Sequence, residues 1–406
     1  MRLALPLLVL AVAAAGCAAE RGHSVILVTI DGARWQEVFG GADARMLESK
    51  ADTRQPQATR KAFWRDSVED RRRVLMPFLW GTVAREGQLL GNVDVGSQVL
   101  VTNPYKISYP GYHELLNGFP SDTIDSNKRV ANPNPTVLEW LHRRPPFQNS
   151  VAAYCSWDLF PFILNRERCG FPVDVCEMGE TPTLIRRLTA DLPSPWQGSV
   201  YDAFVFHAGI EYLREKKPRV MYFAFGDTDE WSHSGDYDNY LESLRRTDAW
   251  LRRLWETVQS MPEYRGKTSL LVTSDHGRGD QPGEWRNHNS RTHGASYIWV
   301  AAIGPRIPGH GEWSEHEPFM RAQVAATVAA LVGRTTRPPF PAPPRRCRSS
   351  PGPNRPSLWS PGGHGFGPLP DAARLREGIR WRSSRNPRSR ATPHRLILLR
   401  RTPPVL

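Results

Sequence analysis

Two apolar stretches of this sequence end abruptly in residues that can bind a metal ion. The stretch Ser269–Thr273 leads into Asp275 and His276, and the earlier stretch Ser24–Ile30 is followed directly by Asp31. Carboxylate oxygens and imidazole nitrogens are ligands that zinc-like ions accept in proteins. A capped turn is the alternative interpretation of each end, because Asp often bonds its own backbone there. Two ends of the same kind favour a metal centre.

A third apolar stretch, Arg219–Phe225, is followed by acidic residues and a histidine. Asp229 and His233 are four residues apart, which places both side chains on one face of a helical turn, as in His-x-x-x-His zinc sites. Asp227 is an alternative ligand, but its spacing of six to His233 suits a single turn less well. This stretch therefore predicts two more ligands.

Two further histidines, His288 and His293, stand in a polar loop after Asp275. Either one would complete a set of six N and O ligands with the residues named above. Six ligands are too many for one tetrahedral ion, but they fit two zinc-like ions with open positions for a substrate. No Cys-x-x-Cys spacing is present, so a zinc–thiolate site is not expected.

Ser108 is the candidate nucleophile. It follows a short apolar stretch and precedes Leu115 and Leu116, as a residue at the start of a helix would. A free serine hydroxyl is a weak nucleophile and needs a base or a metal ion. The N-terminus of a helix would add backbone N–H donors for an anion. A plain helix cap is the alternative role for this serine.

Strands that alternate with helices must position these residues, and that order predicts an α/β fold with a largely parallel central sheet. Ligands of such sheets bind beyond the carboxyl ends of the strands. Besides the three stretches above, strands are expected at 98–102, 150–154 and 297–303, and helices at 60–73, 135–142, 236–261 and 317–331. The segment from about Arg143 to Lys217 is rich in proline and aromatic residues and is expected to form an inserted cap over the site.

The positive charge of the chain is confined to its C-terminal tail. The whole chain of 406 residues has a net charge of +12. Residues 337–406 hold 15 Arg, no Lys and 2 acidic residues, so residues 1–336 are close to neutral. A nucleic-acid partner is therefore not expected for the folded part. The tail also holds 15 of the 36 prolines and should be largely disordered.

The first 19 residues look like an export signal: one positive charge, an apolar run, then small residues. The run is too short to be a good membrane span. Residues 14–17, Ala-Ala-Gly-Cys, resemble a bacterial lipoprotein cleavage site with a lipid anchor on Cys17, and ordinary cleavage near Ala19 is the alternative. An exported protein permits disulfides, and Cys169 and Cys176 are the closest pair in the mature chain.

Five separated motifs occur in the order seen in the alkaline phosphatase superfamily, and they most resemble its type I phosphodiesterase/nucleotide pyrophosphatase branch. They are Asp31-Gly32, Ser108-Tyr109-Pro110, Asp229-x-x-x-His233, Ser274-Asp275-His276-Gly277 and the loop of His288. The resemblance covers roughly Val25 to Val332. It implies a three-layer α/β/α fold and two divalent metal ions, with zinc as the expected metal.

The resemblance also assigns ligands to each ion. One ion would be held by Asp229, His233 and a late histidine, the other by the set Asp31, Asp275, His276 and the nucleophile Ser108. For the late histidine His288 is preferred, because Trp285-x-x-His followed by Gly294 looks like the family pattern, and His293 is the alternative.

Several positions depart from the patterns of the branches. Nucleotide pyrophosphatases usually have Thr at the position of Ser108 and Asn at that of Gly111. Asn127 is the nearest match to their phosphoryl-binding Asn, with a simple turn residue as the equal alternative. Sulfatases need Arg where Tyr112 stands, and the export signal argues against a glycolytic phosphoglycerate mutase role.

The sequence as a whole predicts an exported, periplasmic or membrane-anchored bacterial hydrolase. Its substrate would be a small phosphate mono- or diester, cleaved by metal-activated Ser108 through a phosphoseryl intermediate. Lys106 or Arg34 could contact non-bridging phosphoryl oxygens. The alternatives are a sulfatase-like or phosphoglycerate mutase-like member of the superfamily, or a non-catalytic surface lipoprotein with the same fold. The expected domains are a signal at 1–19, a metallohydrolase domain at 20–336 with its cap at 143–217, and a tail at 337–406.

Overall fold

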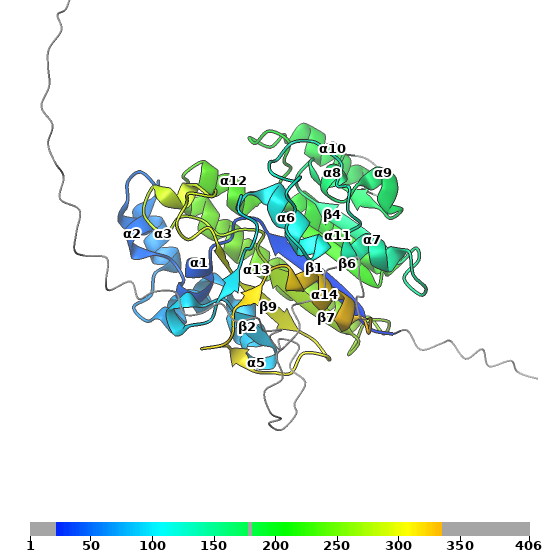
Figure 1. Cartoon of the computed structure of the whole chain (residues 1–406). Coiled ribbons are helices and arrows are strands. Elements are labelled where there is room, and N and C mark those ends of the chain that lie inside the picture. The colour runs from blue at the N-terminus through cyan, green and yellow to red at the C-terminus, as the bar shows by residue number, and fades with distance from the viewer. Residues whose placement is uncertain (1–21, 178–180, 335–406) are drawn as a thin grey trace, which may run out of the picture. The chain divides into compact units, whose positions relative to one another are not determined.

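The structure is a computed structural model that describes residues 22–177 and 181–334 (Figure 1). The expected export signal, residues 1–19, and the basic tail, residues 337–406, lie outside the described residues. Among the helices of the described part, none is both long enough and apolar enough to cross a membrane.

Eight strands form the main sheet, in the order β10-β2-β9-β7-β1-β6-β4-β5. Five neighbouring strands, β7-β1-β6-β4-β5, are all parallel, and β9 is antiparallel to both of its neighbours. The predicted α/β fold with a largely parallel sheet is therefore confirmed. The bounds are β1 (Ser24–Ile30), β2 (Gln88–Leu90), β4 (Val151–Cys155), β5 (Val173–Asp174), β6 (Val220–Phe225), β7 (Thr268–Thr273), β9 (Val300–Ile303) and β10 (Gly311–Glu312).

The register of the central strands brings their carboxyl ends to one edge of the sheet. Ile30 at the end of β1 pairs with Phe225 at the end of β6. On the other side of β1, Thr29 pairs with Thr273, the last residue of β7. Residues that follow these three strands must therefore meet at the same edge, where parallel sheets bind their ligands.

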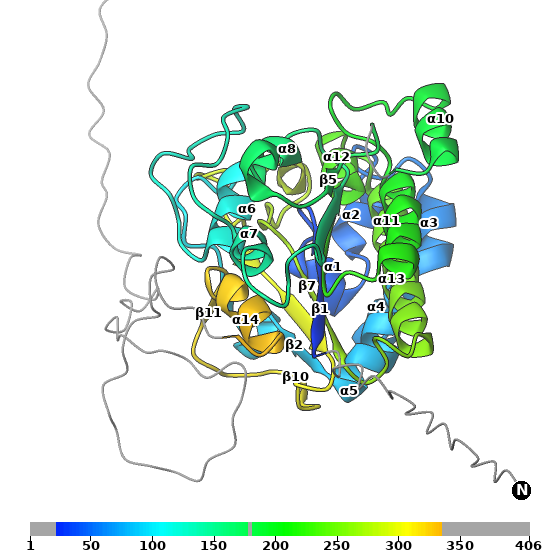
Figure 2. The same ribbon diagram turned by 90° about the vertical axis from the view of Figure 1, so that its right-hand side faces the viewer.

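Helices cover both faces of the sheet and complete the three layers (Figure 2). One face carries α11 (Asp202–Lys216), α13 (Tyr237–Ser260) and α4 (Val68–Leu75), and the other carries α6 (Ser108–Asn117), α7 (Val137–His142) and α14 (Gln323–Leu331). A hydrophobic cluster fills each interface. Because side chains alternate along a strand, Ile26 and Val28 of β1 enter one cluster, and Val25 and Leu27 enter the other.

The remaining elements are short. A second sheet of three strands has the order β11-β3-β8, with β3 (Val99–Leu100), β8 (Tyr297–Ile298) and β11 (Phe319–Met320). The short helices are α1 (Trp35–Gly40), α2 (Ala44–Glu48), α3 (Pro56–Phe63), α5 (Ala84–Glu86), α8 (Phe160–Ile163), α9 (Arg166–Cys169), α10 (Thr183–Asp191) and α12 (Asp227–His233), with a π-helical turn at Leu79–Val83 and single 3-10 turns at Val93–Val95 and Glu284–Arg286.

Three predicted elements have different bounds in the structure. The strand expected at 297–303 is two strands, because β8 pairs with β3 while β9 pairs with β7. The helix expected at 317–331 begins only at Gln323, because Phe319 and Met320 pair with β3. The basic helix expected at 60–73 is split into α3 and α4, and Ser67 caps the second of these by accepting from the N–H of Asp70.

The predicted cap, residues 143–217, is not a separate unit. Its strands β4 and β5 belong to the main sheet, and its helix α11 covers one face of that sheet. The cap boundaries were therefore too wide. Within residues 143–217, only α8, α9, α10 and their loops lie outside the main sheet and its covering helix and could cover a site. The expected disulfide is also wrong: Cys155, Cys169 and Cys176 are all buried free thiols.

Candidate active site

Three strand ends deliver the predicted carboxylates to one place. Asp31 follows β1 directly, Asp275 lies just beyond β7, and Asp229 is in the first turn of α12, which begins after β6. Two hydrogen bonds tie these ends together. The N–H of Gly32 donates to Oδ1 of Asp275 over 3.0 Å, and the hydroxyl of Thr228 donates to the carbonyl of Asp31 over 2.5 Å.

Asp31, Asp275 and His276 form a first group of possible ligands. Nε2 of His276 lies 3.3 Å from Oδ1 of Asp31 and 3.4 Å from Oδ2 of Asp275. All three residues are buried, and their ligand atoms lie within 4.8 Å of one another. Burial, and then the negative charge of Asp31, raise the pKa of Asp275 to about 8. Such a carboxylate is costly to keep charged without a cation beside it.

The chemistry of this first group fits a divalent metal ion. Oδ1 of Asp31 and Oδ2 of Asp275 are buried and accept no hydrogen bond from the described residues. A buried carboxylate oxygen without a partner opposes folding, and a bound cation removes that penalty. Two carboxylates and one imidazole also match a zinc site that keeps an open position.

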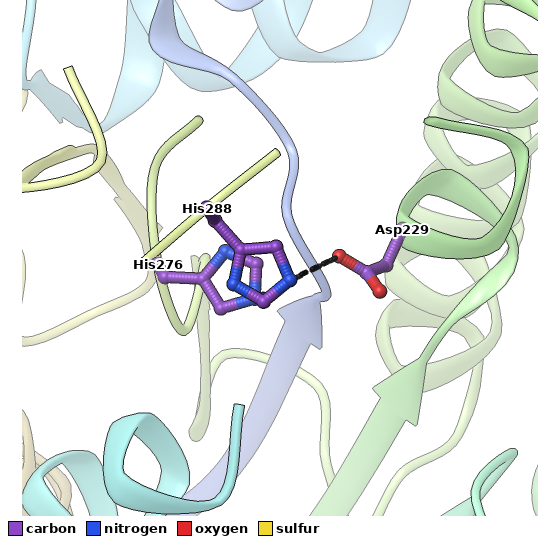
Figure 3. Close-up of side chains that lie close together, drawn as sticks. All are labelled: Asp229, His276 and His288. Carbon is purple, nitrogen blue, oxygen red and sulfur yellow. Dashed lines mark ion pairs between the residues drawn. The ribbon is translucent and has the colours of Figure 1, made fainter. Parts of the chain in front are cut away.

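Asp229, His233 and His288 form a second group. Nε2 of His233 lies 3.2 Å from Oδ2 of Asp229 and 3.0 Å from Nε2 of His288, which is 3.7 Å from Oδ1 of Asp229. Figure 3 shows the ring of His288 face to face with that of His276, with centroids 3.6 Å apart. His276 therefore stands between the two groups, and the ligand atoms of Asp229, His276 and His288 also lie within 4.8 Å of one another.

The histidines of the second group favour the form that can bind a metal. Burial, and then the charge of His276, lower the pKa of His233 and bring the pKa of His288 well below its usual value. Neutral imidazole is the metal-binding form of histidine. Both side chains are therefore available as ligands near neutral pH.

The structure separates the alternative ligands from the site. His288 has a side chain only 6% exposed and shares a hydrogen bond with the carbonyl of Lys106. The side chain of His293, in contrast, is 82% exposed and pairs with Asp280. Asp227 accepts a hydrogen bond from the N–H of Asp202 at the start of α11, and therefore points away from the cluster. The structure thus brings His288, and not His293 or Asp227, into the site.

Ser108 is the first residue of α6, and its hydroxyl points to the first ligand group. Oγ lies 3.3 Å from Nε2 of His276, and the residue is only 4% exposed. The loop before it is held by the carboxylate of Glu114, which accepts from the N–H groups of Thr102 and Asn103. Arg321 donates to Glu114 from the other side over 2.6 Å. A buried ion pair therefore fixes the segment that presents the serine.

Asn127 lies at the N-terminus of the same helix. Its Oδ1 accepts a hydrogen bond of 2.9 Å from the N–H of Tyr109, the residue after Ser108. The side-chain amide is thus next to the backbone donors that a helix N-terminus offers to an anion. From this position Asn127 can contact a phosphoryl group. Its hydrogen bond to Tyr109 also gives it a structural role in capping α6.

Tyr112 is a site residue that sequence reasoning missed. Its hydroxyl donates to Oδ2 of Asp31 over 2.8 Å, and the side chain is buried. Burial raises the pKa of Asp31, but the adjacent His276 and this hydroxyl together outweigh burial and the pKa is lowered. The signal in the sequence was the spacing of four from Ser108, which puts both residues on one face of α6.

Arg278 is a second residue that was missed. It is 1% exposed, directly follows Gly277, and places its guanidinium on Oδ1 of Asp229. Arg34, in contrast, does not reach the position expected for a contact to phosphate: it is fully buried and pairs with Glu37 at 3.2 Å. The expectation for Arg34 was therefore wrong.

A cavity of about 250 Å³ lies near this edge of the sheet. Its lining includes Asp158, Glu177, Leu192, Trp196 and Ser199. Neither Ser108 nor any proposed ligand is among the described residues that line it. Two contacts connect its lining to sequence neighbours of the site: Ser199 donates to Glu230, which follows Asp229, and Arg129, two residues from Asn127, contacts Asp158.

Comparisons with known proteins show to which family this chain is similar. The profile of the type I phosphodiesterase / nucleotide pyrophosphatase family matches residues 43–292, more than half of the chain. The matched region contains Ser108 and all of the predicted ligands except Asp31. A 2,3-bisphosphoglycerate-independent phosphoglycerate mutase from Haloquadratum walsbyi is 30% identical over 136 residues, which are 34% of this chain. The match spans only 26% of the mutase.

Solved structures share the fold at low sequence identity. The lipoteichoic acid synthase LtaP from Listeria monocytogenes is 12% identical, with a TM-score of 0.51 over 78% of this chain and 74% of that chain. Murine ectonucleotide pyrophosphatase / phosphodiesterase 5 is also 12% identical, with a TM-score of 0.47 over 78% of this chain and 96% of that chain. Matched by the family profile over most of its folded part, the chain belongs to the type I phosphodiesterase / nucleotide pyrophosphatase family of phosphoester hydrolases.

Proposed function

We propose that this protein is a metal-dependent hydrolase of small phosphate mono- or diesters with Ser108 as its nucleophile. The observation that carries the proposal is the position of Oγ of Ser108, at the N-terminus of α6 and 3.3 Å from Nε2 of His276. The two unpartnered carboxylate oxygens belong to this same group. A nucleophile, an anion-binding helix end and a cation site thus converge on one point.

Two divalent ions, zinc being expected, complete the proposed site. Asp31, Asp275 and His276 with Ser108 would hold one ion, and the second group, Asp229, His233 and His288, would hold the other. When bound, such ions lower the pKa of a coordinated hydroxyl and offset negative charge on phosphoryl oxygens. Asp229 and His276 face each other at 3.7 Å, so the two positions would be adjacent.

The residues of the chain supply the rest of the reaction. In the first step Oγ of Ser108 forms a bond to phosphorus in line with the departing oxygen, and the P–O bond to the alcohol breaks. The serine proton leaves to solvent and the alcohol oxygen takes up a proton. In the second step a water oxygen forms a bond to phosphorus, the bond between phosphorus and Oγ of Ser108 breaks, and Oγ takes up a proton, so the serine is restored and phosphate, or a phosphate monoester when the substrate is a diester, is released. Because Oδ1 of Asn127 accepts from the N–H of Tyr109, the NH₂ group of Asn127 would be the donor that orients a non-bridging oxygen.

The alcohol part of the ester would lie in the 250 Å³ cavity. Asp158 and Glu177 line this cavity, together with the ring of Trp196, and no Lys or Arg is among the described residues that line it. Because Arg129 pairs with Asp158, the negative charge that a second phosphate would meet there is mainly that of Glu177, which would repel it. The cavity therefore favours simple esters over esters whose alcohol part carries phosphate.

The experiment that tests this proposal is a chelator-controlled assay on three p-nitrophenyl substrates: the phosphate, the phenylphosphonate and the sulfate. We expect release of p-nitrophenol from a phosphorus ester, its loss with a chelator and its return with zinc. Ser108→Ala should lose activity by orders of magnitude and keep its metal content. Retained activity in this variant would exclude the serine mechanism, and preference for the sulfate would place the enzyme with sulfatases.

We also propose that the enzyme is exported, with Cys17 as a lipid attachment site. The support is the sequence of residues 1–19 alone. Fractionation of expressing bacteria should find the protein in the envelope, and Cys17→Ala should release it from the membrane. Recovery of the full-length chain from the cytoplasm would refute export.

A further inference from the structure

The two ligand groups differ in how their carboxylates are already satisfied. In the first group, Oδ1 of Asp31 and Oδ2 of Asp275 accept no hydrogen bond from the described residues and lie 3.3 and 3.4 Å from Nε2 of His276, itself a proposed ligand. In the second group, Oδ2 of Asp229 likewise lies 3.2 Å from a proposed ligand, His233, but Oδ1 is contacted by the guanidinium of Arg278, which is not a ligand. The oxygen that Arg278 contacts is the one that faces His276 and His288.

Arg278 is fixed to two separate segments of the site. Its NH1 donates to the carbonyl of Arg286 over 2.8 Å, in the loop that carries His288. Its NH2 donates to the carbonyl of Asp229 over 3.2 Å as well as to the carboxylate. Nε is buried and has no partner among the described residues. The guanidinium is therefore held near Asp229 even if it leaves the carboxylate.

Gly32 makes room for this guanidinium. A Cβ at this position would lie 2.6 Å from Nε of Arg278 and 2.7 Å from Oδ1 of Asp229. The residue also has a φ of +59°, which side chains rarely adopt. Any larger residue at position 32 would push the arginine and Asp229 apart. The turn after β1 is thus shaped to let a cation lie against a proposed metal ligand.

We propose that Arg278 is an internal counter-ion for Asp229 and makes the two metal positions unequal. The proposal rests on the two-ion site of the proposed function. The first ion binds at Asp31, Asp275 and His276. Binding at Asp229, His233 and His288 is weaker, because the guanidinium must leave Oδ1 of Asp229 before that oxygen can bind a metal.

Two physical effects act in the same direction. A charge-assisted hydrogen bond must be broken at Asp229, and such bonds are among the strongest in proteins. The guanidinium then stays nearby, because it still donates to the backbone carbonyls of Arg286 and Asp229. There its positive charge repels the incoming cation. The first group has the opposite character, since its two buried oxygens face only another proposed ligand, His276, and no arginine has to leave before a cation binds there. The order of loading follows from this contrast.

The test is a titration of the metal-free protein with Zn²⁺, followed by calorimetry and by the visible spectrum of Co²⁺ as a second probe. We expect two binding steps whose dissociation constants differ by about ten- to a hundredfold, the effect typical of changes next to metal ligands. Asp275→Asn should abolish the tight step, and His233→Ala should abolish the weak one. Two equal steps in the natural protein, or a weak step that is lost in Asp275→Asn instead, would overturn the proposal.

Two variants of Arg278, one that removes its charge and one that keeps it, test whether this charge weakens the second binding step. Arg278→Gln should tighten the weak step by about tenfold and leave the tight step unchanged, whereas Arg278→Lys should keep the two steps apart. A weaker second step in Arg278→Gln would show that the arginine supports metal binding, contrary to the proposal. If Arg278→Gln does not fold, Arg278→Lys and the two ligand variants still decide whether the steps are unequal and where each ion binds. If no metal binds to the natural protein, the two-ion function itself fails, and metal binding with no hydrolysis would leave this inference intact while refuting catalysis.

Discussion

Glu114→Gln is expected to destabilise the protein strongly at neutral pH, because it breaks the buried ion pair under the nucleophile helix. The carboxylate accepts from the N–H of Thr102 at 3.0 Å, the N–H of Asn103 at 2.9 Å and the amide of Asn103 at 3.0 Å. It also pairs with Arg321 at 2.6 Å, and both side chains are 0% exposed. A glutamine has one acceptor oxygen in place of two, and its NH₂ group would face other donors.

The size of the loss of stability follows from the state of Arg321 after Glu114 is replaced. Nε and NH1 of Arg321 already have no partner among the described residues, so this guanidinium would lose its only ion pair. Removing one member of a buried pair costs about 3–5 kcal/mol, a large share of a typical stability of about 5–15 kcal/mol. Because replacing both members can restore much of the loss, the double variant with Glu114→Gln and Arg321→Met should be more stable than Glu114→Gln alone.

The pH dependence gives this prediction a second signature. Burial raises the pKa of Glu114, but the charge of Arg321 and the hydrogen bonds from Thr102 and Asn103 outweigh burial, so the pKa is lowered from 4.5. A lowered pKa in the folded state contributes stability above pH 4.5, and this stability is lost as the pH falls through the folded value. The difference between the natural protein and Glu114→Gln should therefore be largest at pH 7 and shrink in acid.

Urea unfolding followed by tryptophan fluorescence, at pH 7 and at several values below 4.5, measures both signatures. The supporting result is a loss of about 3–5 kcal/mol at pH 7 that becomes smaller in acid and is partly recovered in the double variant. A loss below about 1 kcal/mol at pH 7, the range of an exposed pair, would refute the reasoning. A difference that grows in acid would refute it as well.

Two further predictions concern residues of the interior. Tyr112→Phe removes the donor to Oδ2 of Asp31 and should weaken metal binding about ten- to a hundredfold, measured by competition with a chelating dye; an unchanged affinity would contradict a role in positioning Asp31. Asp248 accepts from the N–H groups of Phe78 and Leu79, and burial raises its pKa to about 7. Because the pKa of Asp248 is raised in the folded state, the stability that this residue contributes is full below about pH 3.8, its ordinary pKa. This stability is lost as the pH rises through the folded value of about 7. Asp248→Asn, which leaves a buried donor unpaired, should therefore be less stable by about 1–3 kcal/mol at pH 5, with a gap that narrows toward pH 8 in urea titrations; a constant gap would contradict the titration of Asp248.

The sequence was sufficient to locate the strand ends of the site. Asp31 and Asp275 could be placed because buried parallel strands are continuous apolar runs, and because the residues after them share one edge. The pair Asp229 and His233 could be placed because spacing of four is diagnostic of one helical face. These arguments need only local patterns and the general rule for parallel sheets.

Contacts between segments far apart in the sequence were not predictable in the same way. Arg278 follows a glycine and has the appearance of a surface cation, and its burial depends on the space left by Gly32. The strand expected at 297–303 is divided because Ile298 pairs with Val99 of one sheet and Val300 pairs with Thr273 of the other, pairings that no local pattern indicates. The start of α14 was misplaced because Phe319 joins a strand pair with Val99. In each case tertiary pairing overrode local propensity.

The position of β1 in the middle of the sheet has a consequence for how the protein is made. This strand precedes the other strands of its sheet, and its neighbours β6 (Val220–Phe225) and β7 (Thr268–Thr273) follow it by about 195 and about 245 residues. Until then both edges of a strand that is fully buried in the folded protein are unpaired, which is a hazard for aggregation, and pairing over such separations is slow. Nascent chains that end before Asp275 cannot contain the site. We expect the growing polypeptide to depend on chaperones that shield β1 until β7 (Thr268–Thr273) has been made.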